Sequence, residues 1–289
     1  MYRILISLFL VLGISQAVIG QSDDSKKKKS KGKKTITADP DAKLQTPQDV
    51  AFDEKSGLFY ISSPGNNGVI KRGRRGGAVF AVKGLNHPRG VMIESGILYV
   101  ADSNAVKGFN LKTEEKVFEQ TVEGATALRS ISSDGTDIFV SDKEANTVFK
   151  INIKKKDVSV LTKDVIAPAG LLYNKKLKEV LILSSQESGG GIYSCSLKDN
   201  TVELALSIPE YPYLEDITFN GSMSYYLTAW GADKKENVII KVTDSLKREP
   251  RIIQSTADGP CGLKYIKRTN ELAIANAYGD NLNIIKLGY

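Results

Sequence analysis

A repeated segment of about forty residues constrains the fold of this chain more than any other feature. Six stretches of the 289 residues show the same order of a short apolar strand, a polar turn and a second apolar strand. They begin at Pro47, Pro88, Leu128, Pro168, Leu214 and Pro260, with spacings of 41, 40, 40, 46 and 46 residues. Such spacing with four strands per unit is typical of propeller blades, and no segment shows a helical period. The sequence therefore predicts an all-β, six-bladed β-propeller over residues 34–289.

The last unit is shorter than the others and ends after three strands, in LNIIKLGY. Residues 34–38 (KTITA) precede the first unit and alternate as a strand does. We expect this N-terminal strand to complete the last blade and close the ring, which would cover an exposed sheet edge. The alternatives are an open array or a seventh blade supplied from elsewhere, and the chain has too few residues for a seventh.

The N-terminus has the pattern of a signal peptide over residues 1–20. Arg3 is followed by an apolar run, and small residues follow at Ala17 and Gly20. A membrane anchor is the alternative, but the run is shorter than the ~20 residues that a spanning helix needs, and no later segment is long enough. We expect a secreted protein, extracellular or periplasmic, without a transmembrane span.

A lysine-rich tail follows over residues 21–33 and is predicted to be disordered, because it has almost nothing to bury. Residues 22–34 contain seven lysines and two aspartates, so they and Arg3 account for all but one unit of the formal net charge of +7. The propeller itself is nearly neutral, and we expect no specific nucleic-acid binding. The tail either holds a polyanion through its charge or is a solvated spacer.

Few residues suggest catalysis. Cys195 and Cys261 fall on blades that are not adjacent, so we expect two buried or half-buried free thiols and no disulfide. The single histidine, His87, is either a general base or a packing residue between blades. The chain has no GxSxG elbow for a nucleophilic serine, and we predict no catalytic residues.

Residues 86–111, NHPRGVMIESGILYVADSNAVKGFNL, resemble an NHL repeat. The six units together resemble the superfamily of gluconolactonase/regucalcin, paraoxonase and strictosidine-synthase-like propellers. This resemblance covers about residues 34–289. It implies a divalent cation, usually calcium, held at the channel mouth by Glu, Asn and Asp.

The position that matches those ligands is the one after each anchor. The residues there are Gln48, Arg89, Arg129, Ala169, Glu215 and Cys261. Hard cations need several oxygen ligands with charge, and Glu215 is the only carboxylate of the set, which makes it a weak metal candidate. We therefore predict no cofactor, with Ca2+ or another divalent cation as the alternative.

The repeat places Arg89, Arg129 and Glu215 around one channel mouth. Glu215 could neutralise the arginines in a structural pair. Otherwise one guanidinium is free to bind a carboxylate, phosphate or sulfate. Asp102 and Asp142, at the ends of second strands in the second and third blades, are the other acids able to pair with the arginines.

Aromatic residues are expected on the same face as the channel mouth. Trp230 and Tyr278 lie in loops between second and third strands, and Tyr211 and Tyr213 lie in the connection before the fifth unit. They either pack beneath their own loops or form the rim of a pocket. The predicted ligand-binding residues are Arg89, Arg129, Asp142, Glu215, Trp230 and Tyr278.

Three functions stay open at this point. The first is an exported, monomeric binding module for a small anionic molecule, a peptide or a glycan at the channel mouth. The alternative is a metal-dependent lactonase- or esterase-like hydrolase with an altered ligand set. The third is an envelope or matrix protein that acts through its lysine-rich tail.

Overall fold

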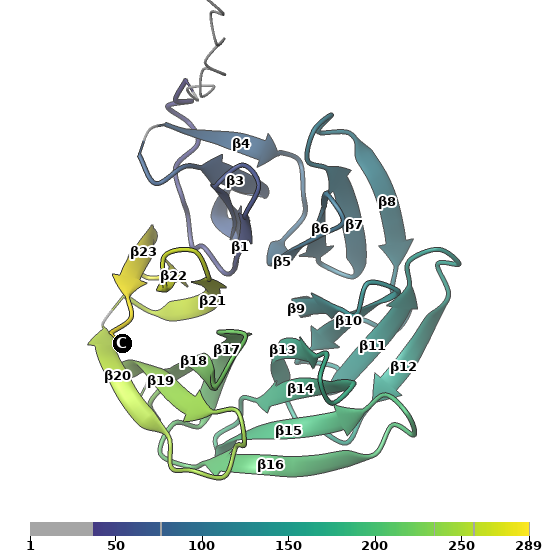
Figure 1. Cartoon of the computed structure of the whole chain (residues 1–289). Helices are drawn as coiled ribbons and strands as arrows, with labels where there is room; N and C mark the ends of the chain where they lie inside the picture. The colour runs from purple at the N-terminus through teal and green to yellow at the C-terminus, as the bar shows by residue number, and fades with distance from the viewer. Residues whose placement is uncertain (1–36, 76, 234, 257, 289) are drawn as a thin grey trace, which may run out of the picture. The chain divides into compact units, whose positions relative to one another are not determined.

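The structure, a computed structural model, describes residues 37–288 except 76, 234 and 257. It contains five four-stranded antiparallel sheets and one three-stranded sheet, arranged as six blades around a central channel (Figure 1). The only helix in these residues is one 3-10 turn, η1 (Pro64–Asn66). The predicted all-β, six-bladed propeller is confirmed.

Each blade begins with its innermost strand and proceeds outward. Blade 1 comprises β1 (Val50–Asp53), β2 (Leu58–Ser63), β3 (Gly68–Arg72) and β4 (Ala78–Val82). Blade 2 comprises β5 (Pro88–Glu94), β6 (Ile97–Asp102), β7 (Ala105–Asn110) and β8 (Lys116–Thr121). Blade 3 comprises β9 (Leu128–Ser133), β10 (Asp137–Asp142), β11 (Thr147–Asn152) and β12 (Val158–Thr162).

The remaining blades follow the same plan. Blade 4 comprises β13 (Pro168–Asn174), β14 (Glu179–Ser184), β15 (Gly190–Ser196) and β16 (Val202–Ile208). Blade 5 comprises β17 (Tyr213–Phe219), β18 (Ser224–Trp230), β19 (Asn237–Thr243) and β20 (Arg251–Thr256). Blade 6 comprises β21 (Pro260–Ile266), β22 (Glu271–Asn276) and β23 (Asn281–Lys286).

The core consists of six buried apolar clusters, and each lies between two neighbouring blades. The second strand of a blade is covered on both faces, which explains why LFYISS in β2 and EVLILS in β14 are buried almost throughout. The outer strand β20 has one face in solvent, and Ile252 is half exposed. Burial between blades is the main favourable contribution to the ring.

Blades 6 and 1 meet directly. The N–H of Gly262 in β21 donates to the carbonyl oxygen of Gln48 over 2.8 Å, and Arg74 forms an ion pair with Glu271. Val50, Phe59 and Ala275 belong to the buried cluster between these two blades. The ring is therefore closed by packing, hydrogen bonds and a charge pair.

The predicted closing strand falls largely outside the described residues, which begin at Thr37. Thr37 and Ala38 are not in a strand, and the N–H of Asp39 donates to the carbonyl oxygen of Ala78 in β4 over 2.9 Å. Pairing of residues 34–38 with β23 stays a prediction. The signal peptide and the lysine-rich tail also lie outside the described residues. No helix among the residues described is long and apolar enough to cross a membrane.

Both cysteines are buried free thiols, as expected. Cys195 lies in β15 of blade 4, and Cys261 lies in β21 of blade 6. Burial raises the pKa of each thiol to about 11, so both are poor nucleophiles near neutral pH.

Candidate functional site at the channel mouth

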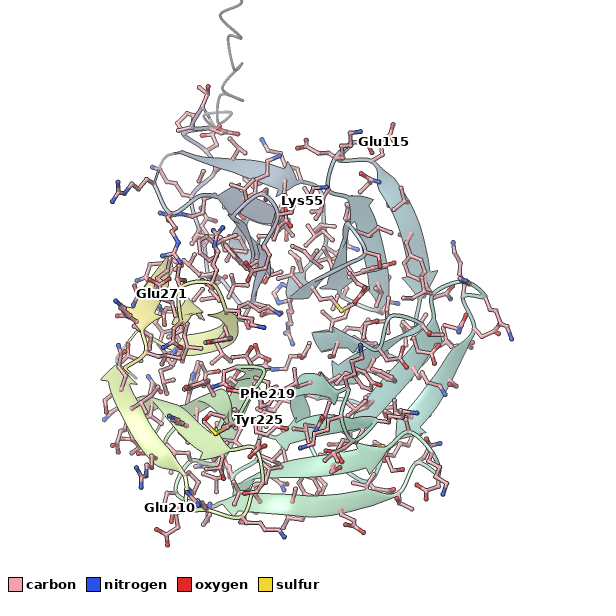
Figure 2. All side chains as sticks on the ribbon, viewed as in Figure 1. Lys55, Glu115, Glu210, Phe219, Tyr225 and Glu271 are labelled. Carbon is pink, nitrogen blue, oxygen red and sulfur yellow. The ribbon has the colours of Figure 1, made fainter. Side chains whose placement is uncertain are left out.

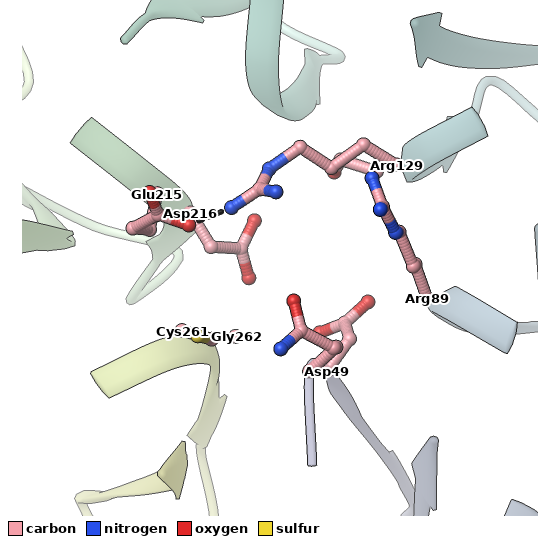
Figure 3. A pocket seen from close by; sticks show the side chains of 9 residues that line it. Asp49, Arg89, Arg129, Glu215, Asp216, Cys261 and Gly262 are labelled. Carbon is pink, nitrogen blue, oxygen red and sulfur yellow. Dashed lines mark ion pairs between the residues drawn. The ribbon is translucent and has the colours of Figure 1, made fainter. Parts of the chain in front are cut away.

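The innermost strands bring three of the predicted residues, Arg89, Arg129 and Glu215, to one cavity at the channel mouth (Figure 3). The other lining residues are Gln48, Asp49, Ser130, Asp216, Cys261 and Gly262. Each side chain comes from the first or second position after a repeat anchor, so the blades deliver them in register around the channel. The cavity measures about 20 Å³, which is room for roughly one water molecule.

Arg129 and Glu215 form an ion pair across the mouth, from β9 to β17. Glu215 is 7 % exposed and the Arg129 side chain 17 %, so the two charges are largely removed from water. Burial lowers the pKa of Arg129. The carboxylate of Glu215 supplies a counter-charge for the buried guanidinium. The Nε of Arg129 is buried without a hydrogen-bond partner among the described atoms.

Arg89 lies beside this pair and is half-buried, with its guanidinium turned toward the channel (Figure 3). Within residues 37–288, as far as they are described, no carboxylate forms an ion pair with Arg89, and no acceptor receives a hydrogen bond from its side chain. Glu215 therefore neutralises only one of the two arginines, Arg129, and Arg89 keeps its hydrogen-bond donors.

Asp102 and Asp142 do not neutralise the arginines. Asp102 forms an ion pair with Lys107 at 2.6 Å and accepts hydrogen bonds from backbone N–H groups of the preceding connection. Asp142 is fully buried and accepts from the N–H groups of Thr126, Ala127 and Ala145. Asp142 was predicted to bind ligand, but it lies outside the cavity lining, because its carboxylate holds together the connection between blades 2 and 3.

Two carboxyl groups that sequence reasoning did not single out, Asp49 and Asp216, line the same cavity as the arginines (Figure 3). Burial raises the pKa of Asp49 to about 6, although N–H groups of Val50 and Val91 and nearby positive charges oppose the shift. Burial and the neighbouring Asp49 raise the pKa of Asp216 well above its usual range. Both acids therefore hold protons more tightly than solvated carboxyl groups do.

One column of the aligned repeats explains why Asp49 and Asp216 lie in this cavity. The second position after the anchors reads Asp49, Gly90, Ser130, Gly170, Asp216 and Gly262, so a polar side chain alternates with glycine. Each polar side chain accepts an N–H from the next blade: Val91 to Asp49 at 2.8 Å, Leu171 to Ser130 at 3.0 Å, and Leu263 to Asp216 at 2.9 Å.

The glycines of this column allow close approach of the following blade. A Cβ on Gly90 would lie 2.5 Å from the carbonyl oxygen of Arg129, and one on Gly262 would lie 2.4 Å from the Cα of Asp49. Gly170 meets the Cα of Asp216 in the same way, at 2.6 Å. Since real Cβ atoms do not come so close, the three positions require glycine.

The second strands of the blades show the same alternation between blades, here with hydroxyl side chains. Ser62, Ser141 and Thr228 of blades 1, 3 and 5 each donate to a carbonyl of the next blade. The equivalent positions in blades 2, 4 and 6 are apolar, as at Ala101 and Ala275. Blades 1 and 2, 3 and 4, and 5 and 6 are thus joined in pairs around the channel. This alternation is visible in the aligned repeats and could have revealed Asp49 and Asp216.

Trp230 and Tyr278 form an aromatic shelf on the same face. Their ring centroids are 5.1 Å apart with an interplanar angle of 47°, and the indole N–H donates to the carbonyl oxygen of Pro260 at 2.7 Å. Pro260 precedes Cys261 of the cavity lining, so the shelf lies next to the mouth but does not line it. Tyr278 is 62 % exposed, whereas Trp230 is partly buried.

The two other aromatics of this face are engaged with acids. Tyr211 donates from its hydroxyl to Glu236 at 3.5 Å, and Tyr213 donates to Glu187 at 3.2 Å. His87, the lone histidine, is an exposed residue, and partial desolvation of its ring and the positive charge of Arg89 lower its pKa.

The donor set at the mouth does not fit the calcium ion that the resemblance implies. Glu215 is committed to Arg129, and Asp49 and Asp216 accept backbone N–H groups. Two guanidinium groups share the same cavity, and their charge would oppose a cation. No group of three or more His, Cys, Asp or Glu side chains in the described residues is arranged to hold a metal.

Comparison with known proteins supports the fold and leaves the activity open. No family model matches the sequence, and no curated protein matches it. A gluconolactonase from Xanthomonas campestris superposes with a TM-score of 0.71 at 10% identity, over 86% of this chain and 88% of that one. Streptogramin B lyase superposes with a TM-score of 0.61 at 16% identity, over 85% and 81%.

A chain from the nidogen/laminin complex superposes as well, with a TM-score of 0.64 at 10% identity, over 80% of this chain and 93% of that one. The neighbours thus include proteins named as enzymes and a chain of a protein complex, and identities this low speak for the fold alone. The protein is a six-bladed β-propeller whose structural neighbours include gluconolactonase-like and streptogramin B lyase-type propellers.

Proposed function

We propose that the protein is an exported binding module whose channel mouth holds the anionic group of a small molecule, a peptide or a glycan. The observation that carries this proposal is the contrast between the two arginines: Arg129 is paired with Glu215, whereas Arg89 has no acidic partner among the described residues. A half-buried guanidinium with free donors suits a carboxylate, phosphate or sulfate.

The size of the cavity limits how such a ligand binds. Because the space between the side chains holds only about one water, the anionic group would sit at the entrance and the rest of the ligand would stay above it. The exposed ring of Tyr278 offers an apolar surface next to the mouth for that remainder.

Titration with acetate, inorganic phosphate and sulfate, followed by NMR or calorimetry, tests the proposal. Arg89→Ala is expected to weaken binding of the preferred anion at least about tenfold, which corresponds to 1.4 kcal/mol. Arg75→Ala is the matched control, since Arg75 is an exposed arginine in the turn between β3 and β4. Equal affinity for Arg89→Ala and the parent, with both folded, would remove the basis of the proposal.

A metal-dependent hydrolase is the second candidate, and the gluconolactonase-like neighbours are the observation that favours it. Its test is elemental analysis of the purified protein together with hydrolysis of a simple lactone. A stoichiometric divalent cation, together with turnover that is lost on chelation, would show that the protein is this hydrolase and would overturn the proposal of a binding module. Deletion of residues 22–34 tests the third possibility, that the tail carries the function.

A further inference from the structure

The two faces of the propeller carry opposite charge. In every blade, the turns that join first to second strands and third to fourth strands lie at one end of the channel, which we call the turn face. The turn face comprises residues 54–57, 73–75, 77, 95–96, 111–115, 134–136, 153–157, 175–178, 197–201, 220–223, 244–250 and 267–270.

By sequence, the turn face contains fifteen lysines and arginines and eight acidic residues, and all fifteen basic residues are exposed. The opposite face is formed by the loops between second and third strands and by the connections between blades. It carries nine acidic residues and, at described positions, four lysines. The near-neutral propeller is therefore a polarised body, and an anionic surface would attract its turn face.

Two large apolar side chains protrude from the turn face on neighbouring blades. Leu177, in the turn between β13 and β14, is 61 % exposed, and Met223, before β18, is 69 % exposed. Lys175, Lys176 and Lys178 surround Leu177, so the tip of blade 4 combines an apolar side chain with three positive charges.

An apolar cleft of about 440 Å³ lies between these two turns. Its lining includes the apolar and aromatic side chains of Leu172, Tyr173, Leu177, Phe219 and Tyr225, together with the charged residues Lys175, Lys176 and Asp244. The rings of Phe219 and Tyr225 lie together in blade 5, with centroids 4.7 Å apart (Figure 2). Protruding apolar groups beside a cleft, within a basic surface, match an interface of acyl chains and anionic headgroups.

We propose that the turn face docks on an anionic lipid surface, with Leu177 and Met223 entering the interface and the lysines of residues 175–178 contacting the headgroups. This inference concerns the face opposite to the channel mouth, and it does not depend on the function proposed for Arg89. A soluble polyanion would use the positive charge alone, whereas the two exposed apolar side chains favour lipid.

Cosedimentation of the full chain with phosphatidylcholine vesicles, with and without about one-third phosphatidylserine, tests this assignment. Binding is expected only with phosphatidylserine. Lys175→Glu/Lys176→Glu is expected to weaken it about tenfold or more, whereas the matched Lys163→Glu/Lys235→Glu variant, with the same charge change on the opposite face, retains it.

Leu177→Ser/Met223→Ser separates lipid from other polyanions. It is expected to reduce vesicle binding about tenfold and to leave binding of heparin unchanged. Ile166→Ser is the control, because Ile166 is 58 % exposed on the opposite face. The assignment to a lipid surface is overturned if both turn-face variants bind vesicles as tightly as the parent, or if the protein binds heparin but no vesicles. Thermal melting of each variant verifies its fold.

Discussion

Replacement of Asp49 by asparagine tests the electrostatics of the channel. Folding moves the Asp49 carboxyl from water to a site where burial raises its pKa from 3.8 to about 6. The folded protein therefore holds this proton more tightly than the unfolded chain does. Between about pH 4 and pH 6, unfolding releases a proton, and each pH unit lowers the free energy of unfolding by about 1.4 kcal/mol.

Over the whole window, ionisation of Asp49 lowers the free energy of unfolding by about 3 kcal/mol, and this loss is complete above pH 6 to 7. Asparagine cannot ionise, and its carbonyl oxygen can keep one of the two N–H bonds from Val50 and Val91. The lost bond costs about 1 kcal/mol. Asp49→Asn is thus expected to be about 2 kcal/mol more stable than the parent at pH 7.5 and no more stable at pH 4.

Urea unfolding of both proteins at intervals between pH 4 and pH 8 measures this difference directly. Glu54→Gln is a suitable control for the loss of one negative charge, because Glu54 is an exposed residue in the turn after β1. The reasoning is refuted if the stability difference between Asp49→Asn and the parent does not change with pH, or if it shrinks as the pH rises.

Four further outcomes follow from the described contacts. Ser141→Ala should lower the free energy of unfolding by about 1–3 kcal/mol in urea titrations, because the buried carbonyl of the next blade loses its donor. Glu215→Gln should destabilise by about 3 kcal/mol in the same assay, since Arg129 is then buried without a counter-charge; an unchanged midpoint would show that solvent reaches the pair. Gly262→Ala should be destabilised in thermal melts, because a methyl group would collide with the backbone of blade 1. Cys195 and Cys261 should react with a thiol reagent only after denaturation and without prior reduction, and fast labelling of the folded protein would contradict their burial.

The sequence was sufficient to predict the fold because each blade repeats one local pattern. Strand pairs separated by polar turns recur at nearly constant spacing, and closing such units in a ring buries their faces. The same register placed Arg89, Arg129 and Glu215 at one mouth without knowledge of any contact.

Pairings between side chains could not be predicted in the same way. Three acids were within reach of the arginines by topology, and only the three-dimensional structure shows that Glu215 pairs with Arg129 while Asp142 binds backbone N–H groups. The pKa of Asp49 likewise depends on how closely the blades pack, which a linear pattern does not specify.

The alternation between blades gives the ring two kinds of joint. Carboxyl and hydroxyl side chains form hydrogen bonds from blade 1 to 2, from 3 to 4 and from 5 to 6. At the other three joints, the innermost strands are in close contact at a glycine. A substitution at a side-chain joint removes a hydrogen bond between blades, whereas a side chain added at a glycine joint forces two closely packed backbones apart. Arg89 and Arg129 stand on opposite sides of one glycine joint, so an anion bound by both guanidinium groups would link blades 2 and 3 directly.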